Sequence, residues 1–393
     1  MGDRQVWRHF DYLSFSVMLV LSGLGLLLVT SATQAIAPPH HPLYYTVRQV
    51  LWIALGLGVL FVTTAVPYER FKALAPYVWG LAVLLLLVVL VKGHAALGAQ
   101  RWIQLGPFEL QPSEFSKVAV VLGLATYLDR EERLTRWRDI AKALAVVAVP
   151  MLLILKQPDL GTALVLVAIV AAMFYIAGVP GWKMLLMFPG GLAVVVLWIY
   201  LHFRFHLFIP MHQYQLNRLI IFLDPQTDPL GAGFNVIQAR IAVGSGGMWG
   251  AGLFGASPSQ LSFLPESYTD FIYAVIGEEL GFVGAAAVLF LYFLLIVRGL
   301  SITAQSRDRF GSLLAAGVTA LFAFHVLESA GMASGVMPVA GVPLPFVSYG
   351  GSAYLTDAAS LGLMINVFMR RHAVPYPETQ NKIMVYSTRQ IPE

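Results

Sequence analysis

The feature that most constrains this chain is a succession of ten apolar runs, most of them long enough to cross a bilayer. A membrane-spanning helix needs about 20 mostly apolar residues. Only 12% of the 393 residues are charged, against about 25% in ordinary globular domains. The sequence therefore predicts an all-α, polytopic membrane protein with about ten transmembrane helices. The predicted spans are residues 12–32, 47–66, 73–92, 113–128, 140–155, 160–178, 182–203, 270–297, 310–334 and 352–369.

The distribution of basic residues predicts the orientation. Of the 25 Lys and Arg residues, 17 fall on the face that carries both termini, and such a face is normally cytoplasmic. We expect one transmembrane domain over residues 1–372 and a polar cytoplasmic tail at 373–393. The first run is too long for the apolar part of a cleavable signal, so it reads as a retained span.

Composition also excludes several kinds of chemistry. The chain has no cysteine, which excludes disulfides, thiol catalysis and cysteine-ligated metals. A net charge of +4 gives no reason to expect a nucleic-acid partner.

One large extracytoplasmic loop is predicted at about 204–269. Helical spacing of apolar residues at 214–222, with Arg218 among them, and at 235–243 predicts amphipathic helices within this loop. The glycines between 244 and 255 would allow the backbone to approach a ligand closely, or would simply add flexibility.

Two predicted spans, 113–128 and 140–155, have only 16 residues each. At 1.5 Å per residue they cover about 24 Å, less than the hydrocarbon core of about 30 Å. We therefore expect their outer ends to lie in a depression below the membrane surface.

Asp270 stands at the point where the outer loop becomes the eighth span. After Thr269 it could act as a helix cap, which is the commoner role for such a residue. In a partly desolvated cavity beside cations it could instead act as a general base that takes a proton from a hydroxyl. We take the second role as the hypothesis.

Isolated charges at the outer ends of other spans could complete such a site. Glu114 and Lys117 are three residues apart and can pair on one helix face. With Arg101 from the preceding loop, Lys117 forms a candidate site for a phosphate or pyrophosphate. Lys156 and Asp159 bracket a tight outer turn, which could be structural or could belong to the site.

The uncharged, proline-rich loop at 338–352 cannot continue a helix, so it must be buried in protein or line a wet cavity. Ser348, the amides of Gly350 and Gly351, and Ser352 at the next helix start could bind an anion. A purely structural turn is the alternative.

Acidic residues also occur at membrane depth. Glu278 and Glu279 point about 100° apart on a helix, so they cannot both face one site. They could support the Asp270 site or form a proton path, as intramembrane acids do in transporters. Glu328 is a third such acid, with His325 one turn before it as a plausible partner.

A series of motifs in a fixed order resembles a known family. These motifs are Gln-Pro-Ser-Glu at 111–114, Lys-Gln-Pro-Asp-Leu-Gly-Thr at 156–162, Phe-Leu-Asp-Pro at 222–225, Pro-Glu-x-x-Thr-Asp-Phe-Ile at 265–272, Gly-Glu-Glu-Leu-Gly at 277–281 and Pro-Leu-Pro-Phe-Val-Ser-Tyr-Gly-Gly-Ser at 343–352. Over about residues 10–372 the chain resembles the SEDS family of peptidoglycan glycosyltransferases, which includes RodA, FtsW and SpoVE. Residues 252–254 and 259–266 are more similar to RodA than to FtsW.

This resemblance implies a bacterial cytoplasmic membrane protein that polymerises lipid II into β-1,4-linked glycan strands, in cell elongation and shape maintenance. It implies lipid II, the lipid-linked strand and a class B penicillin-binding protein as partners. The family's essential aspartate maps onto Asp270, and the Glu, Lys and Asp of its other motifs map onto Glu114, Lys117 and Asp159.

The mechanism expected from the resemblance has Asp270 deprotonating the acceptor hydroxyl at an outward-facing site. Arg101, Lys117 and Arg218 would hold the leaving pyrophosphate, with a divalent cation (Mg²⁺ or Mn²⁺) possible and no organic cofactor. Glu278 and Glu279 would support the site.

Two departures and three alternatives stay open. Tyr268 stands where many relatives have His, and residues 325–330 differ from the family's usual pattern. A lipid II flippase is the first alternative, because of the intramembrane acids. An FtsW-like division polymerase and a non-catalytic scaffold are the others.

Overall fold

The computed structural model describes residues 6–34, 36–96, 99–106, 108–131, 134–206, 208, 213–229, 231, 233–255 and 264–372. Its elements are, in chain order, α2 (Tyr12–Thr33), α3 (Tyr44–Ala65), α4 (Tyr68–Lys92), β1 (His94–Ala96), β2 (Ala99–Leu105), β3 (Phe108–Leu110), α5 (Pro112–Arg130), α6 (Trp137–Lys156), α7 (Leu160–Ile176), α8 (Gly181–Met187), α9 (Pro189–Phe205), α10 (Gln213–Leu223), η1 (Pro225–Thr227), α11 (Phe234–Ser245), α13 (Ile272–Gln305), α14 (Arg309–Ser334) and α15 (Gly351–Met369). The predicted tail at 373–393 lies outside the described residues.

Helices occupy every predicted span, so the all-α polytopic class is confirmed. Within the described residues, six helical segments are long and apolar enough to cross a membrane, counting α8 and α9 as one. Helices α5, α6, α7 and α15 occupy the other four predicted spans. The count of ten crossings stays a prediction.

The prediction of short fourth and fifth spans is wrong. Helix α5 has 19 residues and α6 has 20, which at 1.5 Å per residue is about 30 Å. The added residues are mostly at the opposite ends, Asp129 and Arg130 of α5 and 137–139 of α6, and each outer end gains one residue only. The expected depression at the outer ends therefore stays a prediction.

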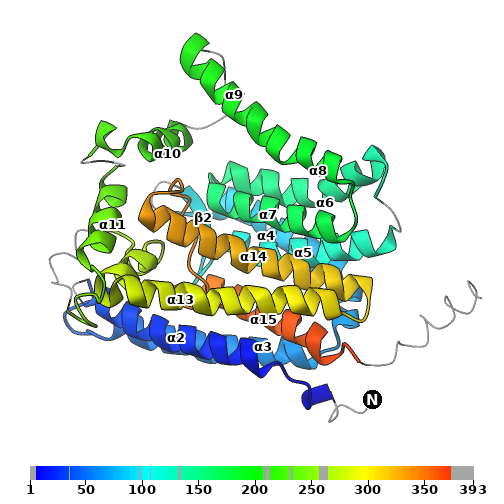
Figure 1. The fold of residues 1–393 in the computed structure, drawn as a ribbon, viewed down its shortest axis with the longest axis horizontal. Coiled ribbons are helices and arrows are strands. Elements are labelled where there is room, and N and C mark those ends of the chain that lie inside the picture. Colours follow the sequence, from blue (N-terminus) through cyan, green and yellow to red (C-terminus); the bar gives the residue numbers. More distant parts are fainter. Residues whose placement is uncertain are drawn as a thin grey trace, which may run out of the picture.

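The centre of the bundle consists of α14 and α15, whose residues are mostly buried. Helix α14 packs on α13, α7 and α5, and α15 packs on α3 and α5. In contrast, α9 leaves the bundle, as Figure 1 shows, and none of its residues is buried. Polar side chains on the central helices therefore lie away from lipid and must find partners inside the protein.

The residues between α4 and α5 form an antiparallel three-stranded sheet in the order β1-β2-β3. Ile103 pairs with Leu110 and Leu105 with Phe108. From sequence we expected only a loop in this segment. The sheet lies at the end of the bundle that also carries α10, α11 and the 335–350 loop, and we call this end the loop face (Figure 1).

The predicted amphipathic helices of the large loop are present as α10 and α11. Helix α11 packs on α13 and α14, so the loop covers part of the bundle.

Helix α13 is interrupted at Gly281, where φ is 66° and ψ is −169°. The backbone groups freed by this break bond to the glycine-rich loop. Ala251 N–H donates to the Glu278 carbonyl at 2.9 Å, and Phe282 N–H donates to the Gly247 carbonyl at 2.9 Å. At Gly250, φ is 78° and a Cβ would lie 2.2 Å from the Glu279 carbonyl oxygen. These glycines therefore allow close backbone packing against α13.

Candidate active site

Asp270 lies in a series of tight turns just before α13. Phe271 is the N-cap of this helix and no side chain caps it, so Asp270 is not a helix cap. Its carboxylate is partly buried, and among the described residues none donates a hydrogen bond to it. Gly341 approaches it closely, since a Cβ built there would lie 3.1 Å from Asp270 Oδ2. Within the described structure this carboxylate therefore makes no hydrogen bond that would give it a structural role.

The proline-rich loop fixes the backbone that carries Asp270. Ser348 Oγ donates to the Thr269 carbonyl at 2.6 Å, and Tyr349 N–H donates to the Tyr268 carbonyl at 2.9 Å. Ser348 Oγ also accepts from Leu344 N–H at 2.8 Å. Ser348, predicted as a possible anion ligand, is thus buried and occupied in holding the Asp270 segment.

A cavity of about 190 Å³ opens beside Asp270 on the loop face. Among the predicted site residues, those that line it are Arg101, Glu114, Arg218, Asp270, Gly350, Gly351 and Ser352. Five segments of the chain therefore meet at this cavity.

The guanidinium-bearing residues Arg101 and Arg218 line this cavity. Arg101 donates from Nε to the Gln157 carbonyl at 3.0 Å and from Nη2 to the Pro158 carbonyl. Arg218 donates from Nη1 to the Val339 carbonyl at 2.9 Å. Burial, together with the charge of Arg101, lowers the pKa of Arg218 to about 10, so Arg218 remains cationic at neutral pH. The pair is suited to a doubly charged anion.

Burial raises the pKa of the Asp270 carboxyl to about 7, and the neighbouring Glu266 carboxylate adds to the rise. Arg218 and Arg101 act in the opposite direction. A carboxylate with a pKa near the ambient pH is a stronger base than an ordinary aspartate and is still largely ionised above pH 7. Burial and the neighbouring charges together place the pKa of Asp270 in the range that a general base needs.

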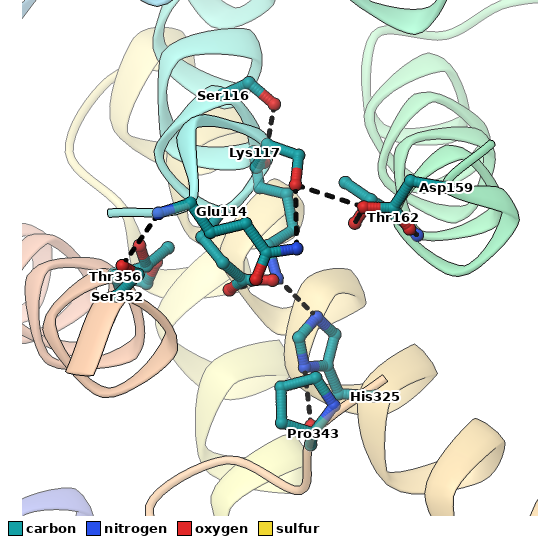
Figure 2. A network of polar contacts seen from close by, with 12 residues as sticks. Glu114, Ser116, Lys117, Asp159, Thr162, His325, Pro343, Ser352 and Thr356 are labelled. Carbon is teal, nitrogen blue, oxygen red and sulfur yellow. Dashed lines mark hydrogen bonds and ion pairs between the residues drawn. The ribbon is translucent and has the colours of Figure 1, made fainter. Parts of the chain in front are cut away.

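Lys117 does not line the cavity, and the predicted anion site formed with Arg101 is not observed. Lys117 is 1% exposed, and Figure 2 shows it beside Glu114 and His325. Its Nζ lies 2.7 Å from Glu114 Oε2 and 3.0 Å from His325 Nε2. The ammonium group of Lys117 points inward because Glu114 on the same helix and His325 on α14 contact it there. Lys117 therefore forms part of the floor of the site. We call Glu114, Lys117 and His325 the floor network.

The predicted partnership of His325 with Glu328 is wrong. His325 Nδ1 lies 3.1 Å from the Pro343 carbonyl, which can only accept, so Nδ1 carries the proton. Nε2 must then accept from the Lys117 ammonium, and the imidazole is neutral. Glu328 is fully buried, and within the described structure neither of its carboxylate oxygens has a hydrogen-bond partner.

Asp159 caps α7. It accepts from Thr162 N–H at 3.2 Å and from Thr162 Oγ1 at 3.0 Å, and Ser113 Oγ donates to it at 3.1 Å (Figure 2). It therefore links α7 to the start of α5 beneath the cavity. Lys156 is exposed at the end of α6, is not among the residues that line the cavity and forms no described ion pair with Asp159.

Gly350, Gly351 and Ser352 line the cavity at the start of α15. Ser352 Oγ accepts from Gln111 N–H at 3.0 Å and donates to the Glu109 carbonyl at 3.2 Å. The serine thus joins β3 and α5 to α15.

Glu278 and Glu279 lie away from this cavity. Both are buried, and Glu279 accepts a hydrogen bond from Ser31 Oγ on α2. The Glu278 carbonyl accepts from Ala251 N–H, and the Glu279 carbonyl accepts from Gly252 N–H at 2.9 Å. Both residues thus hold the beginning of α13 in place.

Sequence reasoning missed several residues around the site. Glu266, Trp102 and Tyr349 line the cavity, and Glu266 could have been suspected because it lies in the same motif as Asp270. Asp357 is a buried acid on α15 close enough to Lys117 and Glu114 to feel their charges. Asp357 could have been suspected from the sequence, because it is an acidic residue within an apolar span.

Across the described part of the chain, no group of three or more His, Asp or Glu side chains is arranged to hold a metal ion.

The fold and site together define a multi-pass membrane protein with a cavity lined by charged residues on one face. The family model described as "Cell cycle protein", labelled for FtsW, RodA and SpoVE, matches residues 11–373. The chain belongs to this family.

Individual relatives are similar over nearly the whole chain. Peptidoglycan glycosyltransferase MrdB of Escherichia coli K12 is 38% identical over 92% of this chain and 94% of its own. A probable peptidoglycan glycosyltransferase FtsW of Idiomarina loihiensis is 35% identical over 91% of this chain and 87% of its own.

Two solved structures have the same fold. A chain of a peptidoglycan synthase complex that coordinates polymerization and crosslinking matches with a TM-score of 0.77 and 30% identity, over 93% of this chain and 99% of that one. The rod shape determining protein RodA of Thermus thermophilus matches with a TM-score of 0.68 and 28% identity, over 93% and 98%.

Proposed function

We propose that this protein is a RodA-like peptidoglycan glycosyltransferase that polymerises lipid II into β-1,4-linked glycan strands. Family membership and the named activities of its relatives support the reaction class. The observation that carries the mechanism is Asp270, a carboxylate without a described hydrogen-bond donor, in one cavity with Arg101 and Arg218.

The proposed reaction is a single displacement. Asp270 takes the proton from the acceptor sugar hydroxyl as that oxygen forms a bond to the anomeric carbon of the lipid-linked strand. The bond from this carbon to the pyrophosphate oxygen breaks, with inversion at the carbon. Arg101 and Arg218 hold the pyrophosphate and stabilise the negative charge that develops on it.

The floor network supports this chemistry indirectly. Glu114 lines the cavity, and Lys117 neutralises it from below. Because the lysine is fully occupied there, it contributes to the shape and charge of the floor. We propose no direct contact between Lys117 and the pyrophosphate.

We propose that the loop face is extracytoplasmic and that both termini are cytoplasmic, as the loop charges indicate. Lipid-linked substrates would then reach the cavity from the outer leaflet. A class B penicillin-binding protein is the proposed partner, supported by the similarity to a chain of a synthase complex that couples polymerization to crosslinking. A role in elongation is supported by the similarity to RodA.

A divalent cation stays a proposal based on the family resemblance. It would supply further charge neutralisation to the pyrophosphate, whose own oxygens would provide most of its ligands. Activity measured with Mg²⁺, with Mn²⁺ and after chelation tests this point.

The decisive experiment uses the purified protein with its partner and lipid II. Wild type is compared with Asp270→Asn, and Asp139→Asn, in the first turn of α6 and outside the cavity lining, serves as a matched control. We expect strands from wild type and the control only. Strands from Asp270→Asn would contradict the mechanism. If wild type makes no strands but moves lipid II across liposome membranes, the flippase alternative is correct.

A further inference from the structure

A second cavity of about 660 Å³ adjoins the Asp270 cavity on the loop face. This volume falls within the range of about 300–1,000 Å³ that is usual for ligand pockets. The two cavities share part of their walls, so a ligand in one can extend into the other. The shared residues are Trp102, Glu266, Thr269, Tyr349, Gly350 and Gly351.

The wall of the second cavity is unusually rich in aromatic rings. The rings of Tyr45, Tyr268 and Tyr349 pack against one another with centroids 5.2–5.7 Å apart. Trp52 and Phe108 form an edge-on pair at 5.2 Å. Phe108 is 42% exposed, although a large aromatic side chain gains most when it is fully buried. The aromatic wall therefore presents ring surface to the cavity.

The charges around this cavity differ from those around Asp270. Among the described residues that line it, Arg48 is the only basic one, and it lies over the Tyr44 ring at 4.6 Å from the centroid. Two acids, Glu109 and Glu266, also line the wall. The second cavity thus has a single guanidinium where the Asp270 cavity has two, and it offers hydroxyl, carboxylate and guanidinium groups to a ligand with many hydroxyls.

We propose that this aromatic cavity is a saccharide subsite that binds the N-acetylated sugar rings next to the reacting one. A pyranose ring has a face of C–H groups that suits the negative face of an aromatic ring, and a rim of hydroxyls that needs polar partners. Both are present here, and the shared wall leads the bound sugar toward Asp270. The inference rests on the proposed function, because it assumes a glycan substrate.

The bound sugar rings could belong to the growing strand or to the incoming lipid II, since both carry the same sugars. These two possibilities predict different effects on the reaction. A subsite for the strand affects elongation but not the first coupling of two lipid II molecules. A subsite for incoming lipid II raises KM in every coupling, including the first.

The first test measures binding of a soluble probe, a β-1,4-linked tetramer of N-acetylglucosamine, by tryptophan fluorescence on the full-length protein in detergent. The variant is Tyr44→Ala with Phe108→Ala, because both side chains are exposed and should not be needed for folding. We expect wild type and Asp270→Asn to bind equally, and the double variant to bind about tenfold more weakly because two ring contacts are lost. Tyr77→Ala, an exposed tyrosine on α4, is the matched control and should bind as wild type does.

The second test measures strand length and KM for lipid II with the partner present. Shorter strands with an unchanged first coupling assign the subsite to the strand, and a raised KM in all couplings assigns it to incoming lipid II. No tetramer binding by wild type, or equal binding and strand length in the double variant and wild type, overturns the subsite and leaves the proposed function intact. A wild type that binds the tetramer but makes no strands overturns the proposed function instead.

Discussion

The Asp270 cavity and the floor network beneath it use the same kinds of side chain in opposite ways. Asp270 is partly buried, and no described residue donates a hydrogen bond to it. Glu114 and Lys117 are 3% and 1% exposed and lie 2.7 Å apart. A charge left unsatisfied beside a cavity is available for chemistry, whereas a charge paired in the interior is not.

The difference arises from the elements that carry these residues. Asp270 is on a loop pinned by Ser348 and Tyr349, so its position is fixed without bonds to its own carboxylate. Glu114 and Lys117 are on α5, which faces the central helices, where an unpaired charge would be costly. The Asp270 carboxylate and the Glu114–Lys117 ion pair therefore belong to neighbouring parts of the molecule with different environments.

The largest effect that would test this comparison is expected at Asp270. Asp270→Asn should lower the polymerisation rate by about 10³-fold, the usual contribution of a general base. Its melting temperature should not fall. Because burial raises the folded-state pKa, the ionised carboxylate costs folding energy above its unfolded pKa, and the amide removes that cost. Thermal unfolding in detergent checks this, and a strongly destabilised variant would show that Asp270 is structural.

Lys117→Met should have the reverse effect: a large loss of stability, with no loss of activity beyond it. Leaving Glu114 buried without its cation should cost about 3–5 kcal/mol of stability, with activity lost in proportion to the folded protein. The double variant Glu114→Gln with Lys117→Met should recover part of that loss. Lys72→Met is the control, because its ion pair with Asp129 is partly exposed and should contribute less than about 1 kcal/mol. Equal melting temperatures for Lys117→Met and wild type would show that the floor network does not stabilise the protein as proposed.

Arg218→Lys tests the cationic wall. The substitution keeps the charge but loses the planar fork, so we expect about a tenfold lower kcat/KM, with little change in melting temperature. Lys156→Met, at an exposed position outside the cavity, should leave the rate unchanged. If Lys156→Met slowed the enzyme more than Arg218→Lys did, Lys156 and not Arg218 would be the pyrophosphate ligand.

The smallest effect concerns pH. With a pKa of about 7 for Asp270, the ionised base increases as pH rises, so kcat/KM should rise through pH 7 and level off above it. Glu266→Gln removes a negative neighbour, lowers the pKa of Asp270 and should move this rise to lower pH. Rate profiles of the two proteins decide the point, and a profile that does not move would exclude Glu266 as a determinant of the base.

Much of the site could be predicted because its signals are local. Asp270 could be identified from its place at a change from polar loop to apolar span, and α10 and α11 from their helical spacing. The β1–β3 sheet was missed because its strands are short and lie between two long apolar runs. The lengths of α5 and α6 were underestimated because hydropathy stops at polar residues that helical hydrogen bonding does not exclude.

The sequence by itself determined the membrane class, the order of the helices and the identity of the candidate base, since these depend on composition and on neighbouring residues. Only the tertiary structure decided which cations face Asp270, because the direction of a side chain on a helix depends on what packs against it. It turned Lys117 down to Glu114 and His325 and brought Arg218 to the cavity from a helix more than fifty residues before Asp270. The same packing joined the aromatic residues of α3, the sheet and the 335–350 loop into a second cavity, which spacing along the chain could not reveal.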